Sequence, residues 1–176
     1  MEIPYIYDVS ETDSMGAGNR TVHLYRMSLT DGKKEVVYEY TGVLALIKYL
    51  RSYGDNVYYI VDYKIENGEN KDGIQQYKMA GKGLMQISGT TEEITNIIDE
   101  IVTDYAVDME NNNLYYYVYL MLDKQGKEIA ELDMQSISRL IYGDDKYLFA
   151  VSKGYELCYT EKSKLPEIDW QSMTDE

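Results

Sequence analysis

The chain has 176 residues, of which 44% are apolar, and its formal net charge is −14. This length accommodates one well-buried core or a few repeats stacked side by side. The acidity argues against nucleic acid and anionic membrane surfaces as partners, because both attract basic surfaces. No apolar run is long enough to span a bilayer, so we expect no membrane insertion. No secretory signal peptide is visible, and a single cysteine leaves no internal disulfide.

A hairpin-like pattern recurs along the chain. Residues 50–62, 108–118 and 140–151 each combine a lead-in, a tight turn of Gly, Asp or Asn, and a burst of aromatic and β-branched residues. Such turn residues tolerate positive φ, and the bursts favour strands. We therefore predict an all-β chain of antiparallel meander repeats in a single domain, residues 1–176. The approximate repeats are 5–42, 43–89, 104–138 and 139–173.

Two segments have helical spacing. Residues 43–51 are interpreted mainly as a connection and an inner strand, because of their place in the repeat. Thr90 and Glu93 match a capping box, which marks a helix start. Isoleucines at helical spacing follow them, at Ile94, Ile97, Ile98 and Ile101. This pattern indicates a short helix near 91–105, inserted between two repeats.

The repeats resemble those of bacterial β-propellers of the lipoprotein-receptor-like (YWTD-type) family. The matching elements are the aromatic pairs Tyr58-Tyr59 and Tyr115-Tyr116 and the segments 24–32 and 76–81. The resemblance implies propeller blades and an extracellular or cell-surface location. Such propellers close with about six to eight blades, and this chain supplies roughly three and a half. We therefore expect part of a longer chain, a homodimer that completes a ring, or a more compact sheet structure.

The sequence offers little for catalysis. His23 is the only histidine, it lies mid-strand, and no nucleophile elbow accompanies it, so we interpret it as a sheet-face residue. Cys158 lies between apolar and aromatic residues and is interpreted as a small buried side chain. Paired carboxylates for glycoside hydrolysis remain open, because the spacing of the acidic residues selects no pair.

Acidic loops are the metal candidates. Glu69, Asn70 and Asp72, and a second loop at 108–112, offer the hard oxygen ligands that calcium takes. Neither loop matches an EF-hand, and loops rich in Asn and Asp are ordinary. We therefore expect no cofactor, with calcium as the weak alternative.

Tyrosines supply the candidate binding residues. The chain has 20 tyrosines against one phenylalanine and one tryptophan. Side chains alternate along strands, so about half of these rings should pack inside, and the rest could line a rim. Exposed rings with polar tips suit glycans, peptides or proteins. The candidates are Tyr58, Tyr59, Tyr115, Tyr117 and Tyr147, although packing between the repeats is the favoured interpretation of these rings.

These features favour a non-enzymatic interaction module that binds a protein or a glycan. One alternative is a hydrolase or lyase built on a propeller, with acidic residues in a central channel. Another is a structural domain that self-assembles through open ends. A cluster of inward-facing carboxylates with perturbed pKa values would favour the enzyme, and an exposed tyrosine patch would favour binding.

Overall fold

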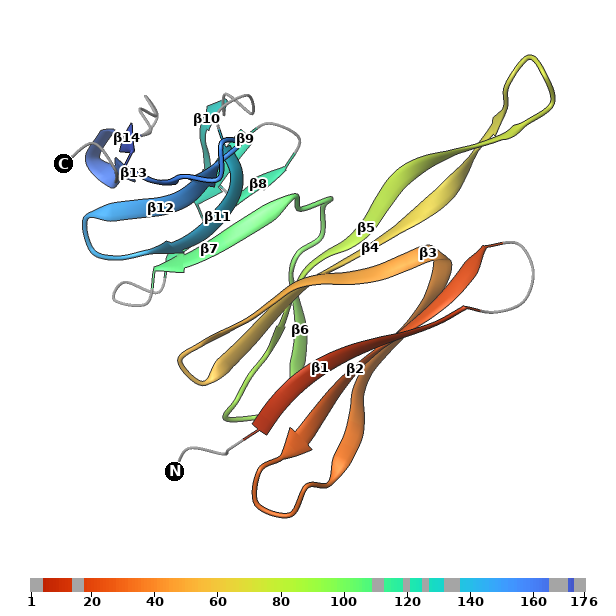
Figure 1. Ribbon diagram of the computed structural model, residues 1–176, viewed down its shortest axis with the longest axis horizontal. Helices are drawn as coiled ribbons and strands as arrows, with labels where there is room; N and C mark the ends of the chain where they lie inside the picture. The colour runs from red at the N-terminus through yellow and green to blue at the C-terminus, as the bar shows by residue number, and fades with distance from the viewer. Residues whose placement is uncertain are drawn as a thin grey trace. The chain divides into compact units, whose positions relative to one another are not determined.

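Most of the described residues lie in strands, and the helical structure among them is one short 3-10 helix, η1 (Lys162–Lys164). It divides into two compact units, Met1–Ile101 and Val102–Glu176 (Figure 1). The prediction of an all-β chain with mainly antiparallel pairing is confirmed. The computed structural model describes residues 5–13, 18–108, 113–118, 121–124, 127–131, 137–164 and 171–172.

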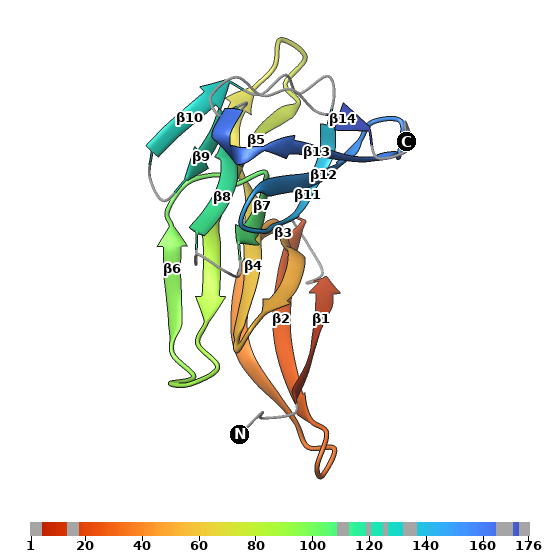
Figure 2. The ribbon, with the colours of Figure 1, turned by 90° about the vertical axis from the view of Figure 1, so that its left-hand side faces the viewer.

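Unit 1 is an antiparallel sheet of six strands that follow one another in chain order. From β2 to β6, tight turns join each strand to the next, as the ribbon shows (Figure 2). Side chains alternate between the two faces of each strand, so each strand can direct one set of residues toward a core. The strands are β1 (Tyr5–Asp13), β2 (Asn19–Ser28), β3 (Lys34–Tyr53), β4 (Asn56–Glu69), β5 (Gln75–Ile87) and β6 (Ile94–Ile98).

β3 is 20 residues long and belongs to both halves of this sheet. Its first half pairs with β2 up to Val43, and its second half pairs with β4 from Val43 to Tyr53. The pairing with β4 shifts register twice, and Leu44 and Tyr49 lie at these shifts with φ of 49° and 52°. Bulges bend a strand, and β3 turns back on itself here (Figure 1). One strand therefore forms a corner between the two halves of the sheet.

The core of unit 1 draws side chains from both halves. Leu24 of β2 and Tyr59 of β4 are fully buried. The ring centroids of Tyr38, in the first half of β3, and Tyr59 are 5.4 Å apart. Burying a large apolar side chain contributes about 1.5–3 kcal/mol, so this cluster holds the corner closed. Its other members are Val22, Ala45, Ile47, Val57, Val61, Met85 and Ile87.

Arg26 of β2 connects distant parts of the six-stranded sheet. Its guanidinium forms an ion pair with Glu35 of β3 and a second one, 2.8 Å long, with Glu92 in the turn between β5 and β6. The hydrogen bond to Glu92 above all raises the pKa of Arg26, and the same bond lowers the pKa of Glu92. The sheet therefore curls until its last turn reaches its second strand.

Unit 2 contains an eight-stranded sheet in the order β10-β9-β8-β7-β11-β12-β13-β14. Two four-stranded meanders meet at β7 and β11, which run parallel and pair at Asp108 and Gly143. The Asp104 carboxylate reinforces this junction, since it accepts hydrogen bonds from the backbone N–H groups of Leu140 (2.6 Å) and Tyr105 (2.8 Å). The strands are β7 (Asp104–Asp108), β8 (Asn113–Val118), β9 (Met121–Lys124), β10 (Lys127–Glu131), β11 (Ile137–Gly143), β12 (Tyr147–Ser152), β13 (Leu157–Glu161) and β14 (Gln171–Ser172).

The predicted short helix near 91–105 is wrong, because this segment contains β6 and the start of β7. The Ser88 hydroxyl accepts a hydrogen bond from the Thr91 N–H (3.2 Å) and so organises a hairpin turn. Ile94 then pairs with Ile87 of β5. β-branched residues suit strands as well, and a neighbouring strand was available to pair with them. Tertiary pairing therefore overrides the helical spacing.

Residues 43–51 all lie in β3, which confirms the strand part of their interpretation and leaves no connection there. The expected limit between the first two repeats, at residues 42–43, falls inside the same strand. The β-propeller arrangement of the repeats stays a prediction.

Candidate functional site

The outer parts of β4 and β5 form a two-stranded ribbon, residues 64–79, which we call the β4–β5 arm (Figure 1). β3 pairs with β4 only as far as Lys64, and β6 pairs with β5 only from Leu84 onward. Beyond Lys64, the two strands of the arm therefore pair only with each other among the described strands. Each of them has an edge whose backbone N–H and C=O groups lack a strand partner in this part of the chain. Such edges are templates for a further strand.

The turn of the arm is held by its own polar groups. The side-chain oxygen of Asn70 accepts hydrogen bonds from the N–H groups of Asp72 and Ile74, both 2.9 Å long. The Gln75 side chain donates to the carbonyl of Gly68 (2.9 Å). This arrangement is an Asx-type turn, and it keeps the two strands of the arm in register.

The arm exposes apolar side chains where a solvated ribbon would carry polar ones. Cross-strand partners lie on the same face, so Met79 shares a face with Lys64, and Tyr77 shares that face with Glu66. Ile65 lies with Lys78 on the opposite face. An isolated two-stranded ribbon is marginally stable in water. The exposed fractions of the apolar side chains are 39% for Ile65, 60% for Ile74, 42% for Tyr77 and 46% for Met79.

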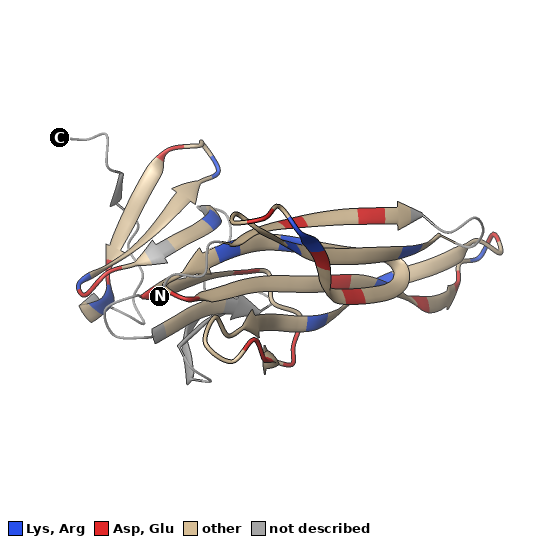
Figure 3. Cartoon of the chain, turned by 90° about the horizontal axis from the view of Figure 1, so that it is seen from below, with Lys and Arg blue, Asp and Glu red and all other residues tan. Residues whose placement is uncertain are grey.

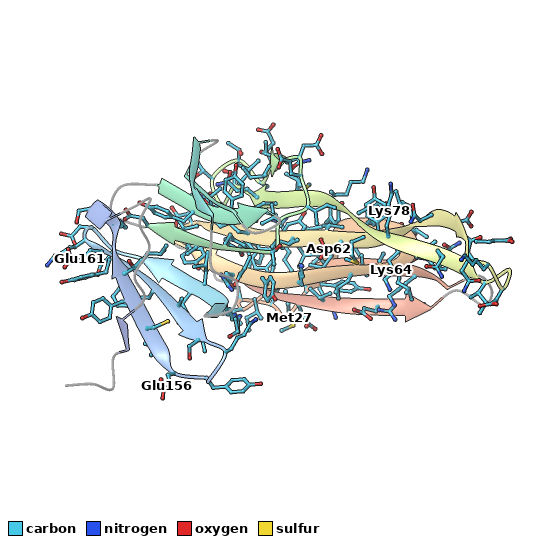
Figure 4. The ribbon with its side chains drawn as sticks, turned by 90° about the horizontal axis from the view of Figure 1, so that it is seen from above. Met27, Asp62, Lys64, Lys78, Glu156 and Glu161 are labelled. Carbon is cyan, nitrogen blue, oxygen red and sulfur yellow. The ribbon has the colours of Figure 1, made fainter. Side chains whose placement is uncertain are left out.

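The charges of the arm cancel, although the chain as a whole carries −14. Figure 3 shows acidic and basic residues side by side along the strands of unit 1. Lys64 and Lys78 lie farther out along β4 and β5 than Asp62 does (Figure 4). Contact at the arm therefore meets less repulsion from an acidic partner than contact elsewhere. The residues concerned are Lys64, Lys71 and Lys78 against Glu66, Glu69 and Asp72.

The predicted tyrosines of unit 1 lie in packed surroundings. Tyr59 is fully buried, and its burial raises the pKa of its hydroxyl. Tyr58 is half-buried, its hydroxyl accepts a hydrogen bond from Gln86 (3.1 Å), and its ring packs edge-on against Tyr53 at 5.9 Å. Sequence reasoning missed Tyr77 as a binding candidate. The signal was the alternation of apolar and charged residues on both strands of a long hairpin.

The predicted tyrosines of unit 2 also pack against other groups. Tyr115 is buried, with an exposed fraction of 1%. Its burial, with the Asp108 carboxylate as the next cause, raises its pKa to about 12. Tyr147 is half-buried, and its ring centroid lies 5.2 Å from that of Tyr159. The backbone of Tyr117 lies in β8, and its side chain is outside the described residues.

Several polar residues of unit 2 form a network beside Tyr115. Asp108 at the end of β7 is fully buried and forms an ion pair with Lys162 of η1. The Lys162 ammonium also donates to the carbonyl of Asp144 and lies 5.3 Å from the centre of the Tyr115 ring. These contacts tie η1 to β7, β8 and the turn before β12. We interpret this network as structural, because the Asp108 carboxylate and the Lys162 ammonium pair with each other.

Unit 1 has a partly satisfied carboxylate on β4. Asp62 is 3% exposed, and one of its oxygens lies 2.5 Å from the Lys48 ammonium of β3. Its other oxygen, Oδ1, is buried without a hydrogen-bond partner among the described residues. Burial raises the pKa of Asp62, and the hydrogen bond to Lys48 opposes that rise in part. Burying a carboxylate costs free energy unless the group is fully paired.

The raised pKa of Asp62 predicts a pH-dependent stability of unit 1. The folded protein binds more protons than the unfolded chain just above the ordinary pKa of 3.8, so stability falls as the pH rises through this window. We expect Asp62→Asn to remove this fall and the control Asp72→Asn, an exposed arm residue, to keep it. The measurement is urea unfolding at a series of pH values. Equal pH profiles for the two variants would contradict the assignment.

Two other residues occupy the places expected for structural roles. His23 lies on the sheet face of β2, with Nε2 2.8 Å from the Glu39 carboxylate. Cys158 is buried and donates to the carbonyl of Ala150 (3.4 Å), which confirms its interpretation as a small buried residue. Burial raises the pKa of its thiol.

The calcium candidates include one residue whose side chain already makes hydrogen bonds, two exposed carboxylates and a loop that lies mostly outside the described residues. Asn70 uses its side-chain oxygen for the turn of the arm, beside Glu69 and Asp72. Residues 109–112 of the second acidic loop lie outside the described residues. In the described part of the chain, no three His, Cys, Asp or Glu side chains gather as a metal site requires. The same residues contain no helix of the length and hydropathy that a membrane span needs.

The arm is therefore the candidate functional site, because it combines open strand edges, exposed apolar side chains and a locally neutral charge. No family model matches the chain, and no match is found among curated proteins or solved structures.

Proposed function

We propose that this chain is a non-enzymatic interaction module that binds a protein partner through the β4–β5 arm. The observation that carries the proposal is the ribbon of residues 64–79, which extends beyond its neighbours β3 and β6. Strand addition to an open edge is a common mode of protein recognition, in which main-chain hydrogen bonds provide affinity and side chains provide specificity. By its resemblance to lipoprotein-receptor-like propellers, the module would act at the bacterial cell surface.

The side chains of the arm favour a protein over a glycan as partner. Glycan sites use aromatic rings together with hydrogen-bonding groups, and the arm exposes one tyrosine, Tyr77. Its other exposed apolar residues, Ile65, Ile74 and Met79, are aliphatic or contain sulfur. Fully burying such a side chain contributes about 1.5–3 kcal/mol, which an apolar protein surface can supply. A few residues usually contribute most of the binding free energy of a protein interface. In the proposed interface, Tyr77 is one of these residues.

The test uses extended peptides selected on the purified chain from a random phage-displayed library. We expect the double variant Tyr77→Ser/Met79→Ser to weaken their binding about tenfold or more, because it removes two apolar contacts. The matched control is Leu29→Ser, which changes a side chain that is 57% exposed in the turn between β2 and β3. Isothermal titration calorimetry measures both.

Unchanged peptide affinity in the double variant would overturn the proposal. A glycan array supplies the other outcome: glycan binding that survives the loss of Tyr77 and Met79, with no peptide selected, would favour the glycan alternative.

A further inference from the structure

We propose that the partner strand of the arm is the same arm in a second copy of this chain. In this arrangement β5 pairs with β5 of the other copy, antiparallel and about a two-fold axis at Tyr77. The inference rests on the proposed function, because it names the partner for the same site. Homodimers with two-fold symmetry are the commonest oligomers, and their interface must be self-complementary.

The free edge of β5 suits such pairing better than that of β4. Pairing with β6 begins at Leu84, so residues 75–81 of β5 lie outside that ladder. This stretch carries a single charge, Lys78, and no proline. The free edge of β4 carries Glu66 and Glu69, which would oppose an acidic neighbour. Charged residues protect strand edges against pairing, so the protection is weaker on β5.

The two-fold register at Tyr77 is self-complementary. It sets Tyr77 opposite Tyr77 of the second copy, Gln76 opposite Lys78, and Gln75 opposite Met79. Directly opposed aromatic residues stabilise antiparallel pairs, whereas directly opposed like charges destabilise them. A register centred on Lys78 would place the two lysines opposite each other. The Tyr77 register avoids this repulsion and joins Tyr77 and Met79 of both copies in one apolar strip.

The charge distribution favours contact at the arm between two copies. Each copy carries −14, while residues 64–79 carry three lysines against three acidic residues. Pairing at the arms brings two neutral segments together. The rest of each copy is acidic, so these parts of the two copies still repel each other. Salt screens that repulsion, so association should strengthen as the ionic strength increases.

The first test is the mass of the full chain in solution, measured by light scattering after size exclusion and by sedimentation over a concentration series. We expect a monomer–dimer equilibrium that shifts toward the dimer at higher salt. Tyr77→Glu places two carboxylates at the centre of the pairing and should weaken dimerisation tenfold or more, at about 1.4 kcal/mol per factor of ten. Leu29→Glu adds the same charge in the turn between β2 and β3 and should leave the dimerisation constant unchanged.

The second test fixes the register. Tyr77→Cys places two thiols opposite each other across the axis, so mild oxidation should give a covalent dimer. Ile65→Cys, on β4, should give none. This test also covers the case in which Tyr77→Glu disturbs the arm itself.

The outcomes separate this inference from the proposed function. A monomer at all concentrations, or a dimer that Tyr77→Glu leaves intact, would overturn self-pairing. If the selected peptides still require Tyr77 and Met79 in that case, the arm remains a site for a different protein. If peptide binding is also unaffected by the loss of Tyr77 and Met79, both self-pairing and the proposed function are wrong.

Discussion

Gly83→Ala should destabilise unit 1 by about 3–4 kcal/mol, a large effect for one added methyl group. Gly83 has φ of +81° at the register shift between β4 and β5, a conformation that other residues adopt at a cost. A Cβ atom there would lie 1.7 Å from the carbonyl oxygen of Ile98 and 2.9 Å from that of Glu100. Both obstacles are backbone atoms, so β6 or the chain after it would have to move.

The matched control is Gly68→Ala in the arm, at the register shift near the end of β4. Gly68 has a similar φ of +75°, but an added Cβ atom meets nothing within 4 Å. The substitution of Gly68 should lower the free energy of unfolding by only about 1–2 kcal/mol, the cost of a left-handed backbone conformation for alanine. Urea unfolding followed by circular dichroism measures the difference, and peptide-resolved hydrogen exchange assigns it to unit 1. Equal losses in the two variants would show that contact with β6 contributes nothing.

Asp104→Ala should destabilise unit 2 by about 2–4 kcal/mol, because it leaves two backbone N–H groups without their acceptor. Asp104 is 1% exposed and accepts hydrogen bonds from Leu140 and Tyr105. The bond to Leu140 crosses the parallel junction of β7 and β11, where the register contains a single residue pair. The carboxylate therefore supplies part of the pairing that a longer ladder would provide.

Two further variants test this role of Asp104. Asp104→Asn keeps one carbonyl oxygen and should lose about half as much stability. Asp145→Ala removes an exposed carboxylate from the turn before β12 and should behave as the wild type. Hydrogen exchange of β7 and β11 gives the readout, with unit 1 as an internal reference. Faster exchange in Asp145→Ala than in Asp104→Ala would contradict the assignment.

Local turn chemistry made the hairpins predictable. The pattern at 50–62 becomes the turn between β3 and β4, where Gly54 has φ of +56°. The pattern at 140–151 becomes the turn between β11 and β12, where Asp144 accepts a hydrogen bond from the Lys146 N–H (2.9 Å). Residues 109–112, the turn of the pattern at 108–118, lie outside the described residues. These signals are local, so they can be recognised without knowledge of the neighbouring strands.

The candidate site could not be predicted in the same way, because burial depends on neighbouring strands. Tyr58 and Tyr59 are adjacent in the sequence, yet Tyr59 is fully buried and Tyr58 only half. Tyr77 resembles Tyr25 in its local sequence, but it lies in the part of β5 that has no pairing with β6. The two bulges in β3 also interrupt the alternation from which faces are inferred. The sequence identified strands with aromatic residues, and sheet pairing decided which of these residues are exposed.

The corner in β3 determines which changes of chain length unit 1 can accept. An inserted residue near Leu44 would move Ala45 and Ile47 to the opposite face of the strand and out of the core. An insertion in the turn of the arm would only lengthen a loop, at a small entropic cost. Relatives of this chain should therefore vary in length at the arm and keep the spacing of β3. The arm is also the place where the module can change its partner while its core is preserved.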